Sequence, residues 1–233
     1  MLKINIIGAG LAGCESALYL ANKGYLVHLF DIKGKSRTPA HHTDDLAEIV
    51  CSNSFKSDDE NTASGVFKRE LTLLGSQLLK TAYENKVPAG QALAVDREKF
   101  STEITAKIMN NKNIIYHSEE VSSIEKDAIT IIATGPLTTD KMCLALKDLI
   151  GTDFLYFYDA AAPIISADSI DINKAYFKAR YDKGDADYLN CPMNKDEYTK
   201  FYNELIAAKT VQLHSFEKNN IFESCMPIEI LAK

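Results

Sequence analysis

Residues 4–31 read INIIGAGLAGCESALYLANKGYLVHLFD, and this stretch decides the fold. The apolar run at residues 4–7 predicts a strand, and residues 11–21 carry apolar side chains at helical spacing. Residues 25–30 predict a second strand, which ends at Asp31. Strand, glycine-rich turn, helix, strand and acidic residue follow one another in the order of a Rossmann βαβ unit. The sequence therefore predicts a dinucleotide-binding α/β fold.

The turn GAGLAG at residues 8–13 gives each glycine a mechanical role. Gly8 allows the tight turn, Gly10 lets the backbone approach a pyrophosphate, and Gly13 lets the helix pack closely on the strand. The diphosphate then lies at the N-terminus of the helix, where backbone N–H groups favour an anion. We expect the whole loop to bind the cofactor: Gly8, Ala9, Gly10, Leu11, Ala12 and Gly13.

Asp31 follows Gly8 by 23 residues and is placed to accept hydrogen bonds from the hydroxyls of an adenosine ribose. A carboxylate at this position repels a ribose phosphate, which favours FAD or NAD over NADP. A GxGxxG motif alone is a weak signal, and a purely structural glycine-rich turn is the alternative. The five features in order favour dinucleotide binding.

The chain has 233 residues, of which 46% are hydrophobic and 25% charged, as is typical of a globular protein. Its five cysteines form no CxxC pair and no targeting segment is visible, which predicts free thiols in a reducing, cytoplasmic compartment. No apolar run reaches the roughly 18 residues of a membrane helix. The net charge of −6 argues against a protein that binds nucleic acid, because phosphate contacts usually require a basic excess.

Residues 170–184 depart from this acidic balance, because basic and aromatic residues alternate there. The residues concerned are Lys174, Lys178, Arg180, Lys183, Tyr176, Phe177 and Tyr181. Such a stretch suits RNA phosphates and bases. A solvated helix face with its aromatic side chains turned to the core is the other interpretation, and composition favours neither.

The remaining pattern predicts a long loop at 32–65, helices at 64–85 and 96–110, and strands at 92–95, 114–117, 121–124 and 128–133. The last strand runs into Ala133, Thr134 and Gly135, where dinucleotide-binding flavoproteins bring the chain back against the cofactor. Beyond residue 138 the alternation of strands and helices fades. We expect a Rossmann-like FAD-binding domain at 1–138 and an inserted α+β domain at 139–233 that binds substrate RNA.

Five further motifs follow in order: PAHHT (39–43), VCSNS (50–54), YFYDAAAPI (156–164), YLNCPM (188–193) and CMPIE (225–229). With the glycine-rich turn they closely resemble the TrmFO family of folate- and FAD-dependent tRNA (uracil-5-)-methyltransferases, over the whole chain. The resemblance implies that a one-carbon unit from methylenetetrahydrofolate is reduced with electrons from flavin and NADH or NADPH. The methyl group then goes to the T-loop uridine of tRNA. Related members act on a uridine of ribosomal RNA, so the choice of RNA stays open.

The cysteines matter because C5 of uracil is a poor nucleophile, and its methylation commonly begins with addition of a thiolate to C6. The resemblance implies that Cys225 is this nucleophile. It also implies that Cys51, in a loop near the flavin, has a supporting catalytic role. Cys14 and Cys143 are interpreted as structural thiols, and Cys191 stays ambiguous.

His41 and His42 lie in a polar loop, where adjacent histidines suggest a metal site. We reject a metal, because no cysteine, histidine or acidic partner stands at ligand spacing. We expect these histidines to hydrogen-bond flavin or to order the loop, with His42 as a cofactor-binding residue; plain solvation of the loop is the alternative. Glu229 is either an acid or base near Cys225 or a surface carboxylate.

The sequence departs from the family pattern in length and at two positions. Family members are longer and return to the flavin-binding domain after the CMPIE motif, whereas this sequence stops at Lys233. Two hypotheses follow: an active enzyme completed by a separately encoded C-terminal fragment, and a non-catalytic flavoprotein remnant. Ser224 replaces a glycine before Cys225, and Asp31 replaces the glutamate of many relatives.

Overall fold

The computed structural model describes residues 3–38, 40–50, 52–151, 165–179, 182, 184–209, 228 and 232. Within these ranges the centre of the fold is a parallel sheet with the strand order β6-β2-β1-β7. Its strands are β1 (Ile4–Ile7), β2 (Val27–Asp31), β6 (Ile114–Ser118) and β7 (Ile129–Ile132). The predicted α/β class with a parallel sheet is confirmed.

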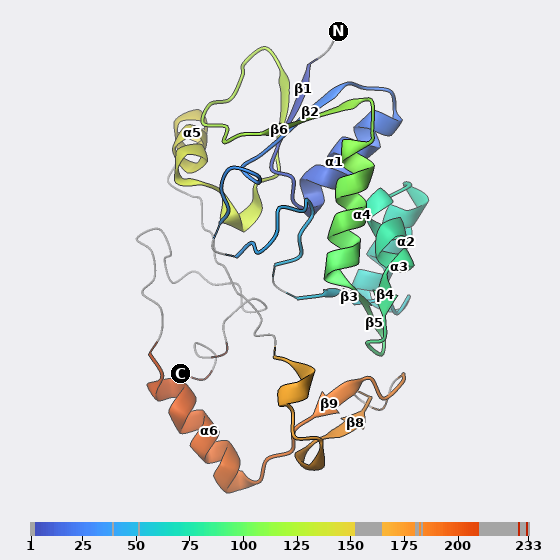
Figure 1. The fold of residues 1–233 in the computed structure, drawn as a ribbon, viewed down its shortest axis with the longest axis vertical. Coiled ribbons are helices and arrows are strands. Elements are labelled where there is room, and N and C mark those ends of the chain that lie inside the picture. The colour runs from blue at the N-terminus through green and yellow to red at the C-terminus, as the bar shows by residue number, and fades with distance from the viewer. Residues whose placement is uncertain are drawn as a thin grey trace.

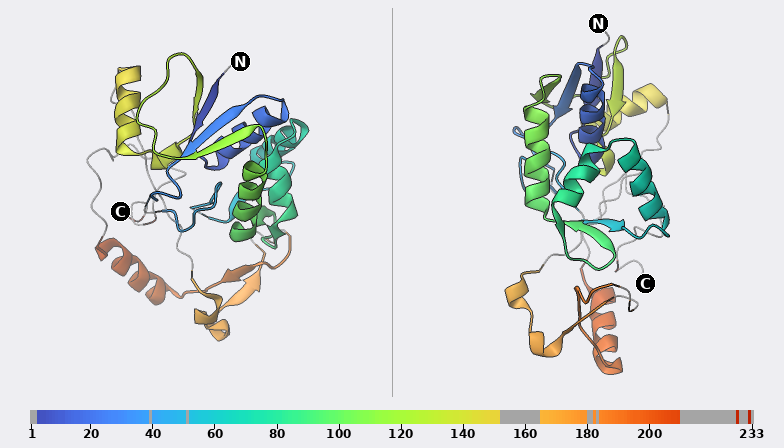
Figure 2. Two further views of the ribbon diagram at one scale, coloured as in Figure 1. Left: turned by 45° about the horizontal axis from the view of Figure 1, so that its top comes forward. Right: turned by 90° about the vertical axis from the view of Figure 1, so that its right-hand side faces the viewer.

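Helices cover both faces of this sheet (Figures 1 and 2). On one face, α1 (Leu11–Asn22) and α4 (Arg97–Met109) pack their apolar side chains onto β1, β2 and β6 and form the main core. On the other face, α5 (Asp140–Ile150) packs Met142 and Leu146 against Ile7 of β1. Since β1 is buried along its whole length, the glycine turn that follows it has a rigid base.

A smaller antiparallel sheet lies beside α3 and α4 in the order β3-β5-β4. Its strands are β3 (Ser54–Ser57), β4 (Lys86–Val87) and β5 (Ala92–Val95), and its helices are α2 (Ala63–Leu73) and α3 (Gln77–Glu84). Glu15 of α1 ties this part to the parallel sheet, because its carboxylate accepts hydrogen bonds from Ser76 Oγ (2.7 Å) and the Leu78 amide (2.9 Å) at the start of α3.

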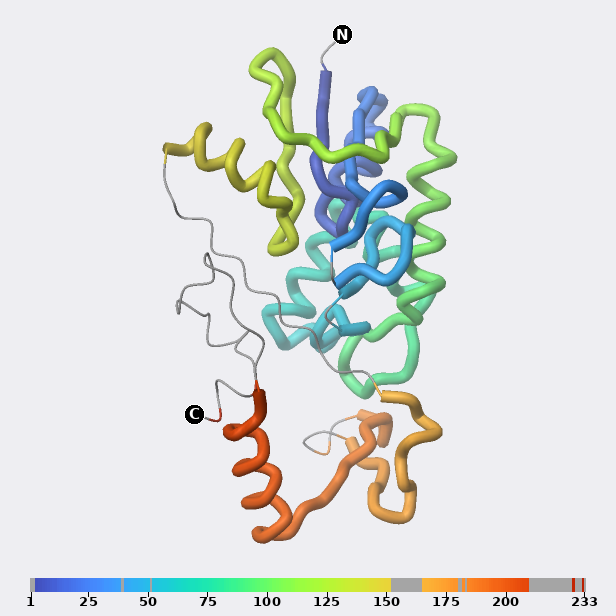
Figure 3. The backbone as a smooth tube through the Cα atoms, turned by 60° about the vertical axis from the view of Figure 1, so that its left-hand side comes forward, coloured from blue at the N-terminus to red at the C-terminus, as the bar shows by residue number. Residues whose placement is uncertain are grey.

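The remaining elements lie at the opposite end of the molecule from the parallel sheet (Figure 3). They are the short 3₁₀ helices η2 (Ala167–Ser169) and η3 (Ile172–Lys174), the hairpin strands β8 (Tyr176–Lys178) and β9 (Tyr188–Asn190), and α6 (Lys195–Ala207). Asn194 and Glu197 form a reciprocal capping box at the start of α6. The predicted domain division at residue 138 stays a prediction.

Three predicted elements are wrong in detail. The helix expected at 64–85 is two helices, because Gly75 adopts φ +83° and the Ser76 side chain then caps α3. The loop expected at 32–65 contains β3 and the start of α2, which Thr62 caps. The strand expected at 121–124 is not formed, since Val121 and Ile124 pack instead onto the cluster around Met142.

Among the helices that the structure describes, none has both the length and the apolar composition that a membrane span needs.

Candidate functional site

The carboxyl ends of β1, β2 and β7 meet at one edge of the parallel sheet. There Gly8 follows β1, Asp31 ends β2, and Ala133 follows β7. Backbone hydrogen bonds join the Gly8 amide to Phe30 O (2.8 Å) and the Ala133 amide to Ile7 O (2.7 Å). This is the edge at which open α/β sheets bind ligands.

Positions 8 and 13 both require glycine, because other backbone atoms lie too close to leave room for a side chain. Gly8 has φ +99°, and a Cβ placed there would lie 2.6 Å from Ala133 O and 2.8 Å from Thr134 N. A Cβ on Gly13 would lie only 1.7 Å from Gly8 O. The tight turn predicted at Gly8 and the close packing predicted at Gly13 are both present in the structure, while contact of either residue with a cofactor stays a prediction.

Gly10 differs from its two neighbours, because a Cβ built there meets nothing within 4 Å. Gly10 is the N-cap of α1 with φ −73°, and no side chain caps this end of the helix. The first N–H groups of a helix have no partner within the helix, and they attract an anion. The open space at Gly10 fits a diphosphate that approaches the backbone of the turn.

Asp31 lies directly beside this turn. Its Oδ2 accepts a hydrogen bond from the Ala9 amide (2.6 Å), and its Oδ1 accepts one from the Lys33 amide (3.0 Å). Each carboxylate oxygen can accept a further bond, so the side chain still has capacity for the hydroxyls of a ribose. The predicted contact with ribose stays a prediction.

Thr134 and Gly135 return the chain to the glycine turn, as the sequence predicts. The backbone nitrogen of Thr134 lies 2.8 Å from the place that a Cβ on Gly8 would occupy. Gly135 begins the 3₁₀ helix η1 (Gly135–Leu137) with φ +62°. The Thr134 and Thr138 hydroxyls lie 2.6 Å apart and fix this segment. The nucleotide-binding edge, as we call it here, thus consists of residues 8–13, Asp31 and residues 133–135.

Cys14 lies beneath the nucleotide-binding edge and is fully buried. Its thiol donates to Ala9 O (3.2 Å). Burial, and then the negative charge of Asp31, raise the pKa of Cys14 far above its ordinary value, so the thiol stays protonated. This agrees with the structural role predicted from the sequence.

The loop segment at residues 40–48 packs against the turn, and sequence reasoning missed it as a structured unit. The Ala47 amide donates to Ala9 O (2.8 Å), and Lys33 Nζ forms an ion pair with Glu48 Oε2 (2.7 Å). Lys33 also donates to the Asp45 carbonyl oxygen. The Lys33 side chain is only 4% exposed, so this pair lies in the interior.

Glu48 organises the histidine loop from within. Its carboxylate accepts hydrogen bonds from the backbone amides of His42 (2.8 Å) and Thr43 (3.4 Å). Burial alone would raise the pKa of Glu48, but Lys33 and these two amides lower it below its usual value. The carboxylate is therefore ionised when it holds the loop.

His41 and His42 both belong to this ordered loop. His41 Nδ1 lies 2.7 Å from Thr38 Oγ1, and the His42 carbonyl oxygen accepts from Arg37 Nη1 (3.0 Å). In the part of the chain that the structure describes, no group of three or more histidine, cysteine, aspartate or glutamate side chains suits a metal ion. Contact between His42 and flavin stays a prediction.

The two candidate catalytic cysteines, Cys51 and Cys225, lie outside the described residues, as does Glu229. The described loop ends at residue 50, two residues beyond Glu48, so the Lys33–Glu48 pair holds the chain immediately before Cys51. Of the other cysteines, Cys143 is half-buried and Cys191 is exposed.

The described part of the basic and aromatic stretch at 170–184 contains the short 3₁₀ helix η3 and the hairpin strand β8, and no α-helix. Tyr176 and Phe177 are 49% and 61% exposed. The interpretation that turns these aromatic side chains to the core is therefore wrong for these two residues. Arg180, Tyr181 and Lys183 lie outside the described ranges.

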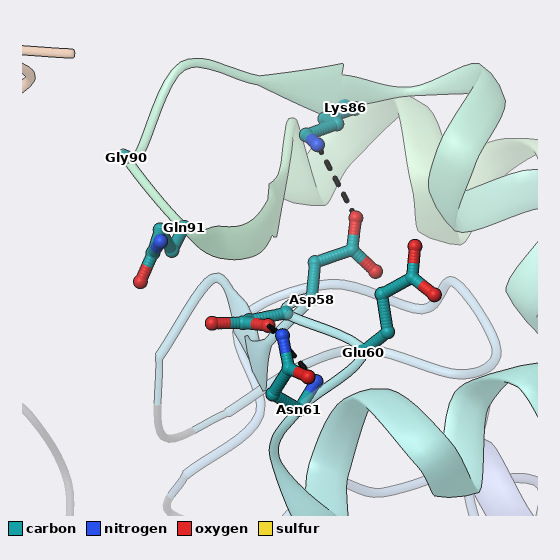
Figure 4. Close-up of a pocket in the computed structure, with 7 residues that line it drawn as sticks. Asp58, Glu60, Asn61, Lys86, Gly90 and Gln91 are labelled. Carbon is teal, nitrogen blue, oxygen red and sulfur yellow. Dashed lines mark hydrogen bonds and ion pairs between the residues drawn. The ribbon is translucent and has the colours of Figure 1, made fainter. Parts of the chain in front are cut away.

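A separate shallow hollow of about 440 Å³ lies between the loop after β3 and the turn between β4 and β5 (Figure 4). Its lining is largely polar and acidic: Asp58, Asp59, Glu60, Asn61, Lys86, Gly90 and Gln91. Lys86 Nζ lies 3.4 Å from Asp58 Oδ2, and Tyr83 donates to Asp58 Oδ1 (2.6 Å). The hollow shares no residue with the nucleotide-binding edge.

Comparison with known proteins bears on this arrangement. Residues 3–233 match the family described as glucose inhibited division protein A. The chain belongs to this family. It is 54% identical over 230 residues to methylenetetrahydrofolate–tRNA-(uracil-5-)-methyltransferase TrmFO of Fusobacterium nucleatum, which is 99% of this chain and 53% of that protein. The TrmFO proteins of Lactobacillus gasseri and Bacillus licheniformis are 52% and 51% identical, with 99% of this chain and 52% and 53% of theirs covered.

The chain thus spans about half the length of the curated relatives it matches. Among solved structures, GidA of Aquifex aeolicus is similar with 20% identity and a TM-score of 0.46, over 57% of this chain and 25% of that chain.

Proposed function

We propose that the protein is a folate- and FAD-dependent methyltransferase that acts on C5 of the T-loop uridine in tRNA. The observation that carries the proposal is the 51–54% identity, over nearly all of this chain, to relatives named as methylenetetrahydrofolate–tRNA-(uracil-5-)-methyltransferases. Methylenetetrahydrofolate is the proposed one-carbon donor and NADH or NADPH the proposed reductant. Since the substrate is tRNA, the proposed place of action is the cytoplasm.

The nucleotide-binding edge supports FAD as the cofactor. The open backbone at Gly10 and the N-terminus of α1 would hold the diphosphate, and the Asp31 carboxylate would accept from the ribose. Thr134 and Gly135 would close over the same ligand. Bound FAD supplies the electron transfer that reduces the one-carbon unit.

Two cysteines of the chain would then supply the reacting thiols, and neighbouring residues would position them. The proposed nucleophile is Cys225, whose thiolate adds to C6 of uracil and makes C5 nucleophilic. The proposed supporting cysteine is Cys51. Lys33 and Glu48 hold the chain just before Cys51 and connect it, through Asp31 and Ala9, to the cofactor turn. His42 is held in the same loop and is the proposed flavin contact from that side.

Exposed aromatic side chains on β8 support an RNA substrate. Tyr176 and Phe177 offer ring faces on which unpaired bases stack, and Lys178 is the adjacent cation. The acidic net charge of −6 means that phosphate contacts have to be local.

The first test is binding of FAD to the purified chain, which flavin fluorescence monitors. Gly10→Ala is the matched variant. The second is methyl transfer from labelled methylenetetrahydrofolate, with NADPH and FAD, to unmethylated tRNA and to unmethylated ribosomal RNA. We expect FAD binding that Gly10→Ala weakens at least tenfold, and label in tRNA only. Label in ribosomal RNA alone would reassign the substrate. Absence of transfer, with a full-length relative active in parallel, would refute the proposal for this chain.

A further inference from the structure

The turn between β4 and β5 is in direct contact with the β8–β9 hairpin, nearly a hundred residues later in the chain. Asp187 Oδ2 accepts a hydrogen bond from the Gly90 amide (2.7 Å), and the Tyr188 hydroxyl donates to Ala89 O (3.0 Å). Figure 1 shows this hairpin next to the turn. Two side chains of the hairpin therefore bond two adjacent backbone groups of the turn.

The shape of the turn permits this approach. Gly90 has φ +57°, and a Cβ placed there would lie 2.9 Å from Cε2 of the Tyr188 ring. On the hairpin, Gly184 has φ +80°, and a Cβ there would lie 3.5 Å from Gly90 Cα. A side chain at position 90 would push the tyrosine away, so the contact depends on a bare backbone at this point.

Each partner in the contact is firmly joined to its own part of the molecule. On the turn side, β5 follows directly, and its Leu93 and Val95 are buried in the main core with Phe100. On the hairpin side, Tyr188 pairs with Lys178 across the strands, and Asn190 Nδ2 donates to Tyr188 O (3.0 Å) just before α6. A displacement of the hairpin is thus resisted by the core.

We propose that Asp187 and Tyr188 are positioning residues that dock the β8–β9 hairpin on the turn at residues 88–91. They fix the region that contains β8, β9 and α6 relative to the nucleotide-binding edge. Ala89 and Gly90 are half-buried residues, and buried backbone groups need partners, which these two side chains supply. This proposal gives Tyr188, the first residue of the YLNCPM motif, a positioning role that is separate from the nucleotide-binding edge.

The test measures the rate of hydrogen exchange at the Gly90 amide. NMR monitors this rate in the whole chain without any ligand. Asp187→Ala removes the acceptor, and we expect the Gly90 amide to exchange about tenfold faster. Asp187→Asn keeps an oxygen acceptor and should retain most of the protection. Tyr188→Phe, which removes only the hydroxyl, should speed exchange throughout residues 88–92. The matched controls are Asp185→Ala and Tyr176→Phe on the same hairpin, which should leave Gly90 unchanged.

Core amides in β2 report on global folding and should keep their exchange rates in all variants. Unchanged exchange at Gly90 in both Asp187→Ala and Tyr188→Phe would overturn the proposal. Equal acceleration by Asp187→Ala and Asp185→Ala would overturn it as well, because the effect would then be one of charge alone.

A consequence for catalysis rests on the proposed function. Asp187→Ala with Tyr188→Phe should raise KM for tRNA while FAD affinity stays unchanged, since the nucleotide-binding edge is untouched. The exchange experiment needs no activity, so a failure of the docking proposal is distinguishable from a failure of the proposed function.

Discussion

The substitution Gly13→Ala is a sharp test of how the nucleotide-binding edge is built. The added Cβ would lie 1.7 Å from Gly8 O and 2.9 Å from Gly8 C, whereas ordinary contacts begin at 3.4 Å. Both obstacles are backbone atoms, which cannot rotate away. Helix α1 therefore has to move by about 1.7 Å relative to the turn after β1.

The free energy of this change follows from the packing of α1. Cys14, Ala17 and Leu18 of the helix are buried against the sheet, so a shift of α1 disturbs the main core. Overpacking a core costs about 1–3 kcal/mol, and a backbone obstacle belongs at the upper end of that range. Alanine returns about 1 kcal/mol through its better helix propensity. We expect Gly13→Ala to lower the free energy of unfolding by about 2 kcal/mol.

Gly10→Ala is the matched control, since it adds the same methyl group three residues earlier. Its Cβ meets nothing within 4 Å, and φ at Gly10 is −73°, which alanine adopts readily. The weaker N-cap preference of alanine and its smaller unfolded-state entropy oppose each other, so stability should stay within about 1 kcal/mol of wild type. The methyl group occupies the space proposed for the diphosphate, however, and FAD affinity should fall at least tenfold.

Urea unfolding, monitored by circular dichroism, measures the free energy of unfolding of each variant, and titration with FAD measures its affinity for the cofactor. Gly13→Ala as stable as wild type would refute the packing argument. Gly10→Ala that binds FAD as tightly as wild type would refute the placement of the diphosphate. Equal loss of stability in both variants would show that the two glycines do not have separate roles.

Four further perturbations test other parts of the site. Cys225→Ala should abolish methyl transfer and leave flavin absorbance intact; retained transfer would identify another nucleophile. Lys33→Met leaves the buried Glu48 carboxylate without its cation and should lower the free energy of unfolding by about 3 kcal/mol, measured in urea, whereas no loss would contradict the role of the pair. Cys14 should resist a thiol reagent at pH 8 until the chain is unfolded, because burial and then Asp31 raise its pKa; rapid labelling of the native protein would disprove this. Burial, and then His117 and Lys3, lower the pKa of His28 below its ordinary value of 6.5, so the folded state binds this proton less tightly than the unfolded state. Stability should therefore fall as the pH drops below about 6.5, and His28→Gln should reduce the difference between urea midpoints at pH 7 and pH 5.

The glycine turn could be predicted from sequence because each requirement there is local. A tight turn after a buried strand, a helix start and close helix packing each demand glycine at a fixed offset, and Gly8, Gly10 and Gly13 occupy those offsets. The return of the chain at Thr134 was predictable for a similar reason, since a β-branched apolar strand runs directly into it. The Lys33–Glu48 pair was not predictable, because nothing in the sequence marks those two residues as buried partners.

Helix α2 shows where apolar spacing misleads. The helical spacing of Val66 and Leu74 predicts that both side chains pack into the core, yet they are 46% and 67% exposed. The helix buries Lys68 instead, whose Nζ donates to Ser57 O (2.7 Å) and Ser64 Oγ (2.7 Å). Polar groups at the end of β3 need donors, and this requirement outweighs the burial of one apolar side chain.

The contacts of Asp31 join two parts of the site that the sequence presents separately. One carboxylate oxygen holds the Ala9 amide in the cofactor turn, and the other holds the Lys33 amide, while the Lys33 side chain holds Glu48. The Ala47 amide donates a hydrogen bond to Ala9 O (2.8 Å) and so joins this loop directly to the turn. A ligand that stabilises the turn therefore stabilises the loop before Cys51, and by linkage an ordered loop favours the ligand to the same extent. The cofactor turn and the loop that leads to residue 50 are in this way parts of one structural unit, although some 40 residues separate Gly10 and Val50 in the sequence.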